Sequence, residues 1–562
     1  MSGIRRRGVA LLAWLVAGFP CPAGRAAAAP APEPPRKKLI ELGWDIVDTA
    51  YLRAHVAEME QNTPFDGAMI RVAGKTADGK PAHSEWCWDA TAWDRASFQV
   101  AIDDLKACRF RTFTDNFVRL NCSPGKLDWA DDAGWKVLAD KAGTLAWVCR
   151  AGGLKGIALD PESYGERLFQ YKAAGERSFA ETAALARKRG AQVMRAIAAE
   201  HPSMTFLSLW LASLCMHAGR TAVPEDILVS DPYGLWPAFL NGLLDAAPPG
   251  MALVDANENG YYIEGDAYHR VASDMRSLTG PAFALVAPEN RAKYRAQMQV
   301  GFGFYLDMYV NPEGNQYYRG PKPGGTRLDR LRDNLAAALA ASDQYVWVYG
   351  EQSRWWGRLD ENRLKNTVGK GRPWEEALPG LTRALAQVRD PAAAARAEVD
   401  ALRSAGTLVN LAKNADFSRR AGDLPADFGT WQDDSSKGRF AWDADGGGSG
   451  RMENVSNGCF IQKHAAKPGE TYYVEAAAKA EGAAIPTLTA RWQREDGAWT
   501  RWDLDATLTF GPAGADGWRR AGGVVTVPDG AGFLVILPGT KSPGGAGGVC
   551  RFDSLGLYRL GP

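Results

Sequence analysis

Histidine is scarce in this chain of 562 residues: there are 6, and no two have the spacing of a metal-ligand pair. This argues against a His-rich metallohydrolase. An excess of one charge is also lacking, because 66 Lys and Arg residues face 65 Asp and Glu residues and leave a net charge of +1. Nucleic-acid binding through a basic surface and strong electrostatic attachment to a membrane are therefore not expected.

Long apolar runs are missing too, and no segment approaches the roughly 18 residues that suggest a membrane span. The N-terminus instead has a short apolar run, Val9–Phe19, which follows Arg5–Arg7 and precedes four alanines at 26–29. This pattern predicts a secretory signal peptide over residues 1–29 that is cleaved near Ala28. We expect a secreted or periplasmic protein without stable membrane insertion.

Cofactor motifs are absent as well. No Gly-rich phosphate-binding motif follows the first predicted strand, which argues against a nucleotide-binding doubly wound sheet. Without the leader residue Cys21, seven cysteines remain, an odd number that leaves at least one free thiol, and they show no metal-binding spacing. We expect no organic cofactor and no catalytic metal.

The chain is rich in apolar residues, at 46%, and in tryptophan, at 20 residues. Strand-like and helix-like segments alternate along it, which predicts an α/β fold: a (β/α)₈ TIM barrel over residues 30–371. The predicted strands are Leu39–Ile46, Ala68–Val72, Phe110–Leu120, Gly156–Leu159, Thr205–Leu211, Ala252–Asp255, Gly301–Val310 and Tyr345–Tyr349. The helices between them include 179–200, which opens with the capping box Ser178/Glu181, and 327–341.

Composition changes after the predicted closing helices and linker at residues 372–406. From 407 to 562, short alternating runs such as Thr471–Ala477 and Thr487–Trp492 are separated by Gly, Pro, Asn and Asp. This pattern predicts an all-β sandwich.

Polar and aromatic residues cluster at the predicted carboxyl ends of the barrel strands, where barrel enzymes carry their active sites. Charged groups beside apolar strands are costly unless they are solvated, paired or functional. The candidates for substrate binding are Trp44, Asp45, Arg71, Asp115, Asn116, Tyr164, Trp210, Asp255, Glu258, Tyr262, Asp307 and Trp355.

The motif Asp160-Pro-Glu162 is the sharpest of these signals. Two residues apart on a strand, both side chains point to one face, so each carboxyl group shifts the pKa of the other. Such a pair suits general acid catalysis, with Glu162 as the acid/base and Asp160 tuning it. Glu351, after the apolar strand 345–349, is the candidate for the second carboxylate or nucleophile, with Asp255 and Glu258 as alternatives.

The ending of strand 4, Gly156 to Glu162, in part resembles the glycoside hydrolase family 18 barrels, in which the last Glu of the motif is the acid. The earlier acidic positions of that motif are Lys155 and Ala158 here. The resemblance implies a glycosidase-like barrel of unassigned family.

The C-terminal segment resembles jelly-roll carbohydrate-binding modules of the family 4/9 type. The resemblance rests on Asn410-x₃-Asn414-x₂-Phe417, the turn Pro468-Gly469-Glu470-Thr-Tyr472 and the closing Phe552-Asp553. It implies sugar-stacking aromatics, for which Trp431, Trp492 and Trp502 are the candidates, and a structural calcium with Asp553 as a candidate ligand.

Together these features predict a secreted enzyme that hydrolyses glycosidic bonds of a poly- or oligosaccharide by paired-carboxylate catalysis. Two alternatives stay open. One is a non-catalytic polysaccharide-binding protein on a glycosidase-like scaffold. The other is a polysaccharide lyase with Tyr164 or Tyr262 as the base.

Overall fold

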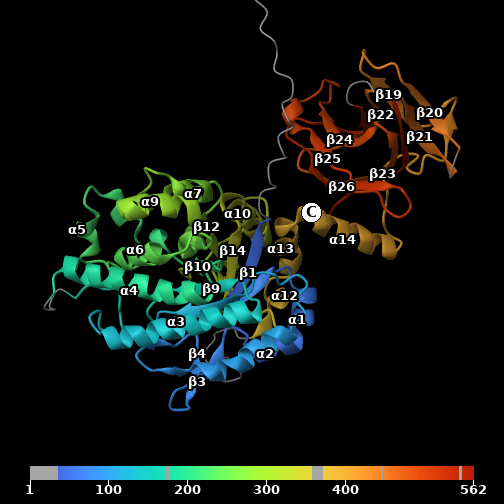
Figure 1. The fold of residues 1–562 in the computed structure, drawn as a ribbon. Coiled ribbons are helices and arrows are strands. Elements are labelled where there is room, and N and C mark those ends of the chain that lie inside the picture. The colour runs from blue at the N-terminus through green and yellow to red at the C-terminus, as the bar shows by residue number, and fades with distance from the viewer. Residues whose placement is uncertain (1–35, 173–176, 357–370, 445–446, 543–546, 562) are drawn as a thin grey trace, which may run out of the picture. The chain divides into compact units, whose positions relative to one another are not determined.

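The structure is a computed structural model, and it describes residues 36–172, 177–356, 371–444, 447–542 and 547–561. The predicted signal peptide and its cleavage site near Ala28 lie outside the described residues. Figure 1 traces the described chain from the first barrel strand to the C-terminal sheets.

Parallel strands form a near-closed barrel, which confirms the predicted fold class. Their order around the barrel is β12-β11-β10-β9-β7-β2-β1-β14-β13. The bounds are β1 Lys38–Gly43, β2 Gly67–Ile70, β7 Phe117–Asn121, β9 Gly156–Asp160, β10 Thr205–Ser208, β11 Ala252–Asp255, β12 Met298–Val300, β13 Phe302–Tyr305 and β14 Tyr345–Gly350.

The predicted strand 301–310 differs from what is observed. Two short strands, β12 and β13, flank Gly301; β12 pairs with β11, and β13 pairs with β14. This one stretch of chain therefore connects the two ends of the sheet. The part after Tyr305 turns into a 3-10 helix, Leu306–Tyr309, instead of continuing as a strand.

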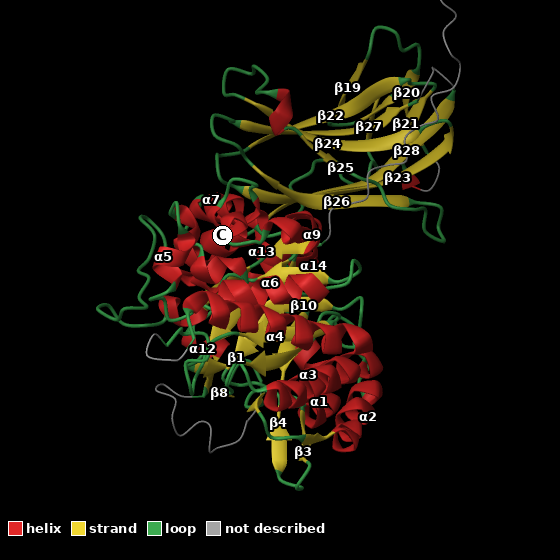
Figure 2. Cartoon of the chain, turned by 60° about the vertical axis from the view of Figure 1, so that its left-hand side comes forward, coloured by secondary structure: helices red, strands yellow, loops and turns green. Residues whose placement is uncertain are grey.

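Helices surround these strands, as Figure 2 shows in red around yellow. Their bounds are α1 Thr49–Asn62, α2 Gln99–Ala107, α3 Asp132–Gly152, α4 Phe179–Glu200, α6 Trp236–Ala246, α7 Ala267–Arg276 and α10 Arg327–Ala341. The predicted capping box of α4 is present: Ser178 Oγ accepts from the Glu181 backbone N–H, and the Glu181 carboxylate accepts from the Ser178 N–H.

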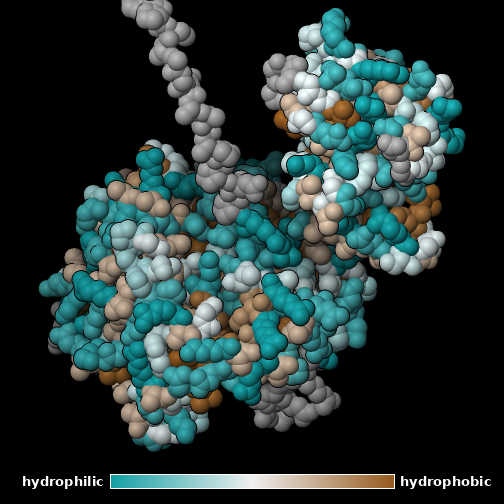
Figure 3. Space-filling model, turned by 45° about the vertical axis from the view of Figure 1, so that its right-hand side comes forward, coloured by the Kyte–Doolittle hydropathy of each residue, from teal (hydrophilic) through white to brown (hydrophobic). Residues whose placement is uncertain are grey.

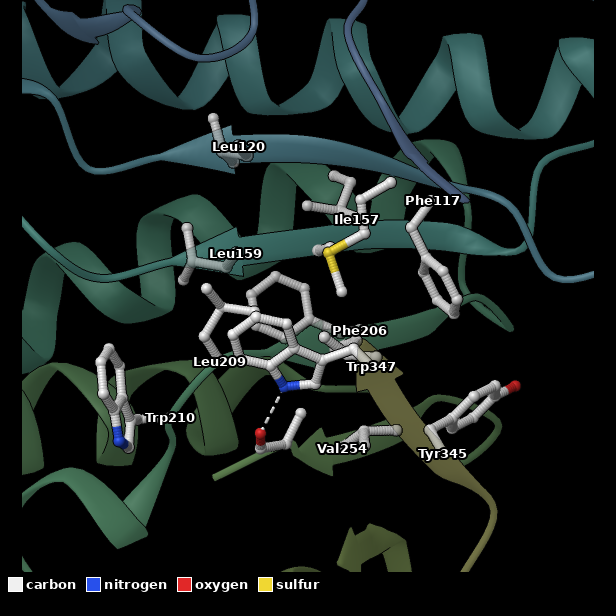
Figure 4. Close-up of a cluster of buried hydrophobic side chains, with 14 of the residues drawn as sticks. Phe117, Leu120, Ile157, Leu159, Phe206, Leu209, Trp210, Val254, Tyr345 and Trp347 are labelled. Carbon is white, nitrogen blue, oxygen red and sulfur yellow. Dashed lines mark hydrogen bonds between the residues drawn. The ribbon is translucent and has the colours of Figure 1, made fainter. Parts of the chain in front are cut away.

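The barrel interior is filled by large side chains from several strands. Figure 4 shows Phe117, Ile157, Phe206, Val254 and Trp347 converging on one another. The Trp347 indole Nε1 donates to the Ala256 carbonyl oxygen at 2.7 Å, so this buried polar group is satisfied. The barrel is thus a packed core whose functional groups lie at its ends.

Among the described residues, the helices α12 Trp374–Ala377, α13 Leu381–Arg389 and α14 Pro391–Ser404 follow the barrel strands. Trp374 of α12 and Leu381 of α13 belong to the barrel core. Ala395 and Val399 of α14 pack instead with Tyr473 and Tyr558 of the C-terminal sheets.

The C-terminal region is an antiparallel sandwich of two main sheets, as predicted. One sheet has the order β19-β22-β27-β24-β25, and the other β20-β21-β28-β23-β26. The bounds are β19 Gly429–Gln432, β20 Arg439–Asp443, β21 Ser449–Glu453, β22 Asn457–Ala465, β23 Thr471–Gly482, β24 Ile485–Gln493, β25 Ala506–Leu508, β26 Arg519–Thr526, β27 Phe533–Lys541 and β28 Gly548–Arg559. Their facing side chains form a second core that includes Phe460, Trp492 and Phe552.

On the face shown in Figure 3, hydrophobic side chains form only small patches among hydrophilic ones. Within the described part of the chain, no helix combines the length and the hydropathy that a membrane span requires. The seven described cysteines are free thiols.

Candidate active site

A cavity of about 870 Å³ opens at the carboxyl ends of the barrel strands. Eight predicted site residues line it: Trp44, Asp160, Glu162, Tyr164, Trp210, Glu258, Tyr262 and Glu351. They come from segments that follow different strands, so only the closing of the barrel brings them together. The cavity is therefore the candidate active site.

Asp160 lies at the end of β9 and is only 1% exposed. Its Oδ1 accepts from the Glu162 backbone N–H at 2.9 Å, and its Oδ2 lies 3.4 Å from the Arg119 guanidinium. Burial raises the pKa of Asp160 to about 6; Arg119 opposes this rise, and the charge of Glu162 adds to it. Asp160 thus titrates near neutral pH within reach of Glu162.

Glu162 is half-buried and faces the cavity. The Tyr164 hydroxyl donates to Glu162 Oε2 at 2.6 Å and lies 3.3 Å from Asp160 Oδ2. Burial, together with the two neighbouring carboxylates, raises the pKa of Tyr164. Tyr164 therefore keeps its proton and orients the Glu162 carboxylate.

Glu258 follows β11 and brings a third carboxyl group to the same cluster. Burial and the charges of Asp160 and Glu162 raise its pKa well above the usual range, against the effect of Arg119. The Oε2 atom is buried and has no hydrogen-bond partner among the described residues. Glu258 thus faces the cavity beside two other carboxyl groups, whose negative charge disfavours its ionised form.

Glu351 enters the cavity from the segment after β14. The Tyr349 hydroxyl donates to Glu351 Oε1 at 2.9 Å and accepts from the Trp44 indole at 2.8 Å. Asp307, buried behind it, accepts from the Glu351 backbone N–H at 2.7 Å and from the Gln352 N–H at 3.2 Å. Asp307 does not line the cavity but holds the backbone that carries Glu351.

Asp45 and Trp355 are joined by a hydrogen bond. The Asp45 carboxylate is 6% exposed and accepts from the Trp355 backbone N–H at 2.6 Å. The Trp355 ring packs edge-on against Phe65 with 4.9 Å between centroids. Neither side chain lines the cavity. Asp45 also lies near Glu41, a residue not predicted from the sequence, whose pKa burial and Asp45 raise well above normal.

Asp115 and Asn116 are displaced to the other end of the barrel, because β7 begins only at Phe117. The Asp115 carboxylate lies 2.8 Å from Lys38 Nζ and accepts from the Tyr345 hydroxyl at 2.8 Å, both at the starts of their strands. Burial would raise the pKa of Asp115, but these donors outweigh it and lower the pKa. The predicted strand began at residue 110, before the true start of β7 at Phe117. The prediction therefore assigned Asp115 and Asn116 to the wrong end of the barrel.

Asp255 and Arg71 lie close to the cavity without lining it. Asp255 is fully buried, and its carboxylate accepts from the backbone N–H groups of Leu211 and Ser213, each at 2.9 Å. It therefore shapes the segment that leads to Trp210. The Arg71 guanidinium pairs with Glu85, which does line the cavity.

Sequence reasoning missed several cavity residues, chiefly Glu85, Arg119 and Tyr305. Arg119 lies inside a strand, so a search of strand ends overlooks it. A sequence signal is nevertheless present. Alternate residues of a strand share one face, so Arg119 lies on the same face as Phe117 and Asn121. Tyr261 and Tyr349 stack in parallel, 5.9 Å apart, and form one wall of the cavity.

The three candidate tryptophans of the sandwich differ in exposure. Trp431 is 50% exposed and Trp502 80%, whereas Trp492 is 1% exposed. Trp492 belongs to the sandwich core, and its indole donates to the Leu504 carbonyl at 2.8 Å. It points inward because the even-numbered residues of this part of β24 face the core, so it is not a surface-stacking residue.

Asp553 in β28 is half-buried, and burial and the charge of Asp416 raise its pKa. Across the described residues, no group of three or more His, Cys, Asp or Glu side chains is placed to hold a metal ion. The calcium site stays a prediction.

No family model and no curated protein matches this chain. Among solved structures, a family 4 carbohydrate-binding module is similar at 18% identity over 26% of this chain and 99% of that chain, with a TM-score of 0.20. The CBM22-1–GH10 modules of a Clostridium thermocellum xylanase are similar at 12% identity over 27% and 28% of the two chains, with a TM-score of 0.20. A bacteriophage CBA120 tailspike domain is similar at 15% identity over 27% of this chain and only 22% of its own, with a TM-score of 0.22.

Proposed function

We propose that the protein is a carbohydrate-active enzyme that hydrolyses glycosidic bonds of a poly- or oligosaccharide in the barrel cavity. The observation that supports this most is the meeting of Asp160, Glu162, Glu258 and Glu351 in one cavity with aromatic side chains around them. Glycosidic cleavage needs one protonated carboxyl group for the leaving oxygen and one ionised carboxylate for water or the sugar carbon. Unlike environments keep carboxyl groups in these different states.

In this proposal Glu162 is the acid/base, because it is half-buried and oriented by Tyr164. Asp160 tunes Glu162, and Glu351 is the second carboxylate, fixed by Tyr349 and by the backbone contacts to Asp307. β9 and β14 are separated by three strands in the sheet order, so Glu162 and Glu351 approach the substrate from opposite sides. Glu258 follows β11, two strands from β9, and lines the same cavity.

The tyrosine pKa values give no support to a lyase. A tyrosine base must lose its proton readily, yet desolvation of the hydroxyl and neighbouring acidic or phenolic groups raise the pKa of Tyr262 to about 12 and also raise that of Tyr164, although more than half of each side chain is exposed. Both hydroxyls therefore stay protonated at neutral pH.

For the sandwich we propose glycan binding through the exposed indoles of Trp431 and Trp502, since an exposed aromatic face can stack on a sugar ring. We also propose that the protein acts outside the cytoplasm, on the basis of its N-terminal sequence pattern.

A substrate screen with site variants tests the hydrolase. The purified full-length protein is incubated with a panel of polysaccharides, and the best substrate is then used for kinetics. We expect Glu162→Gln to lower turnover by about 10²–10⁴-fold, with smaller losses on substrates whose leaving group is activated. Glu351→Gln should show no such sparing, and azide should partly rescue Glu351→Ala if Glu351 is the nucleophile.

The matched control is Glu225→Gln, an exposed carboxylate in the helix Pro224–Leu228, which should keep wild-type turnover. Unchanged turnover of Glu162→Gln on unactivated substrates would contradict its role. Tight glycan binding without any cleavage would instead favour the non-catalytic binding protein.

A further inference from the structure

Acidic side chains outnumber basic ones in the lining of the cavity. Five carboxyl groups line it, those of Glu85, Asp160, Glu162, Glu258 and Glu351, and Arg119 is the one cation among the described lining residues. The whole chain, by contrast, has a net charge of only +1. The acidity is therefore a local property of this end of the barrel and not a consequence of composition.

The available guanidinium groups are already engaged. Arg119 lies 3.4 Å from Asp160 and 3.7 Å from Glu85, and Arg71 pairs with the same Glu85. Within the described part of the chain, the carboxylates of Glu162 and Glu351 accept hydrogen bonds only from tyrosine hydroxyls. A concave site with this balance focuses a negative potential that attracts cations and repels anions.

Three buried polar atoms at the cavity wall lack hydrogen-bond partners among the described residues: Glu258 Oε2, the Tyr261 hydroxyl and Trp210 Nε1. Glu258 and Tyr261 lie close enough to shift each other's pKa, whereas Trp210 Nε1, in a side chain only 7% exposed, has no acceptor near it in the described part of the chain. Buried polar groups are normally satisfied, so this wall points to a polar ligand. A ligand that meets Glu258 and Trp210 must bring hydrogen-bond donors and acceptors together.

An ammonium group can satisfy Glu258 Oε2, because it supplies a positive charge and three hydrogen-bond donors. The aromatic faces of Tyr261 and Tyr262 at the same cavity add a favourable surface for a cation. A neighbouring sugar hydroxyl can accept from the Trp210 indole.

We propose that the substrate is a glycan with free amino groups, whose ammonium groups supply the positive charge that the cavity lacks. This inference rests on the proposed glycosidase function and names its substrate class. It also implies discrimination against uronic acids, whose carboxylates would meet a surface of the same charge.

The test compares matched tetrasaccharides of one linkage at a time: glucosamine, N-acetylglucosamine, glucose and glucuronic acid. Binding is measured by calorimetry with the full-length Glu162→Gln variant, and kcat/KM is measured with the wild type. We expect the glucosamine tetramer to be preferred by at least about tenfold over its N-acetylated form, which corresponds to about 1.4 kcal/mol. Raising the salt from about 0.01 M to about 1 M shortens the screening length from about 30 Å to about 3 Å and should remove most of this preference.

Charge variants then locate the effect. Glu258→Gln should reduce the ratio of glucosamine to N-acetylglucosamine affinity several-fold, whereas Glu225→Gln on the exposed helix should leave the ratio unchanged. Equal or tighter binding of the acetylated, neutral or uronic tetramer would overturn the proposed substrate class. Cleavage of a neutral tetramer with no preference for the amino form would overturn this inference alone, while failure to bind or cleave any tetramer would count against the glycosidase function as well.

Discussion

The carboxyl groups in and behind the cavity differ mainly in their burial and in their hydrogen-bond partners. Asp160 is buried beside Arg119, Glu162 is half-buried beside a tyrosine, and Glu258 has a buried oxygen without a partner. Burial raises the pKa of Asp307 to about 7, although its carboxylate accepts two backbone hydrogen bonds. The pKa values of Asp160, Glu258 and Asp307 are thereby raised to different extents.

Asp160→Asn should change how activity and stability depend on pH. Burial raises the pKa of Asp160 from 3.8 to about 6, so the wild-type kcat/KM profile should show an inflection near pH 6 that the variant lacks. The folded protein also binds more protons at this site than the unfolded chain does. Relative to the variant, the wild-type free energy of unfolding should therefore fall as pH rises from about 4 to about 6.

Kinetics across pH and urea unfolding at several pH values measure the two effects. An inflection of the same size and position in Asp160→Asn would assign the titration to another group, such as Glu258.

The sandwich tryptophans should respond to substitution in opposite ways. Trp492 is 1% exposed within the core, so Trp492→Ala should destabilise the protein by about 3–5 kcal/mol. Trp431 is half-exposed, so Trp431→Ala should leave stability nearly unchanged and weaken glycan binding. Chemical denaturation and affinity electrophoresis measure these outcomes. Equal glycan retardation of the wild type and Trp431→Ala would remove Trp431 from the binding surface.

At the scale of elements, helix boundaries follow local capping chemistry. The bounds of α4 and α10 match the prediction, and both helices begin with a capping box, formed by Ser178/Glu181 and Thr326/Asp329. The boundaries of β7 and β13 were predicted less well. Their limits depend on pairing with neighbouring strands and not on residues within them.

Ser178→Ala should destabilise the protein by about 1 kcal/mol, because it removes the side-chain acceptor for the Glu181 backbone N–H. Urea unfolding monitored by circular dichroism measures the change. Ser203→Ala, at an exposed position before β10, is the matched control and should have little effect. A loss in the control as large as that in Ser178→Ala would show that the cap is not its cause.

At the scale of the whole molecule, the sandwich has a hydrophobic core of its own, separate from that of the barrel. Residues 407–562 are accordingly predicted to fold alone. Helix α14 adds Ala395 and Val399 to a small cluster with Tyr473 and Tyr558. A fragment of residues 390–562, which includes α14, can therefore be compared with the fragment 407–562, which lacks it.

Both fragments should show a cooperative β-type unfolding transition by circular dichroism. The longer one should be more stable by about 2 kcal/mol, because α14 covers the two tyrosines and buries Val399. An unfolded 407–562 fragment beside a folded 390–562 fragment would move the domain boundary to the start of α14.

The sequence by itself determined what depends on neighbours along the chain: the alternation of strands and helices, the capping of α4, and the change to a β pattern near residue 407. It also placed Glu162 and Glu351 at strand ends, because polar residues directly after apolar strands are a local signal. Only the tertiary structure decided which of these residues share a cavity. Barrel closure brought Arg119 and Glu85 into the cavity and placed Asp115 at the opposite end. The packing of the two C-terminal sheets buried Trp492. In both cases, strand register and the face a side chain takes depend on pairing between segments far apart in sequence.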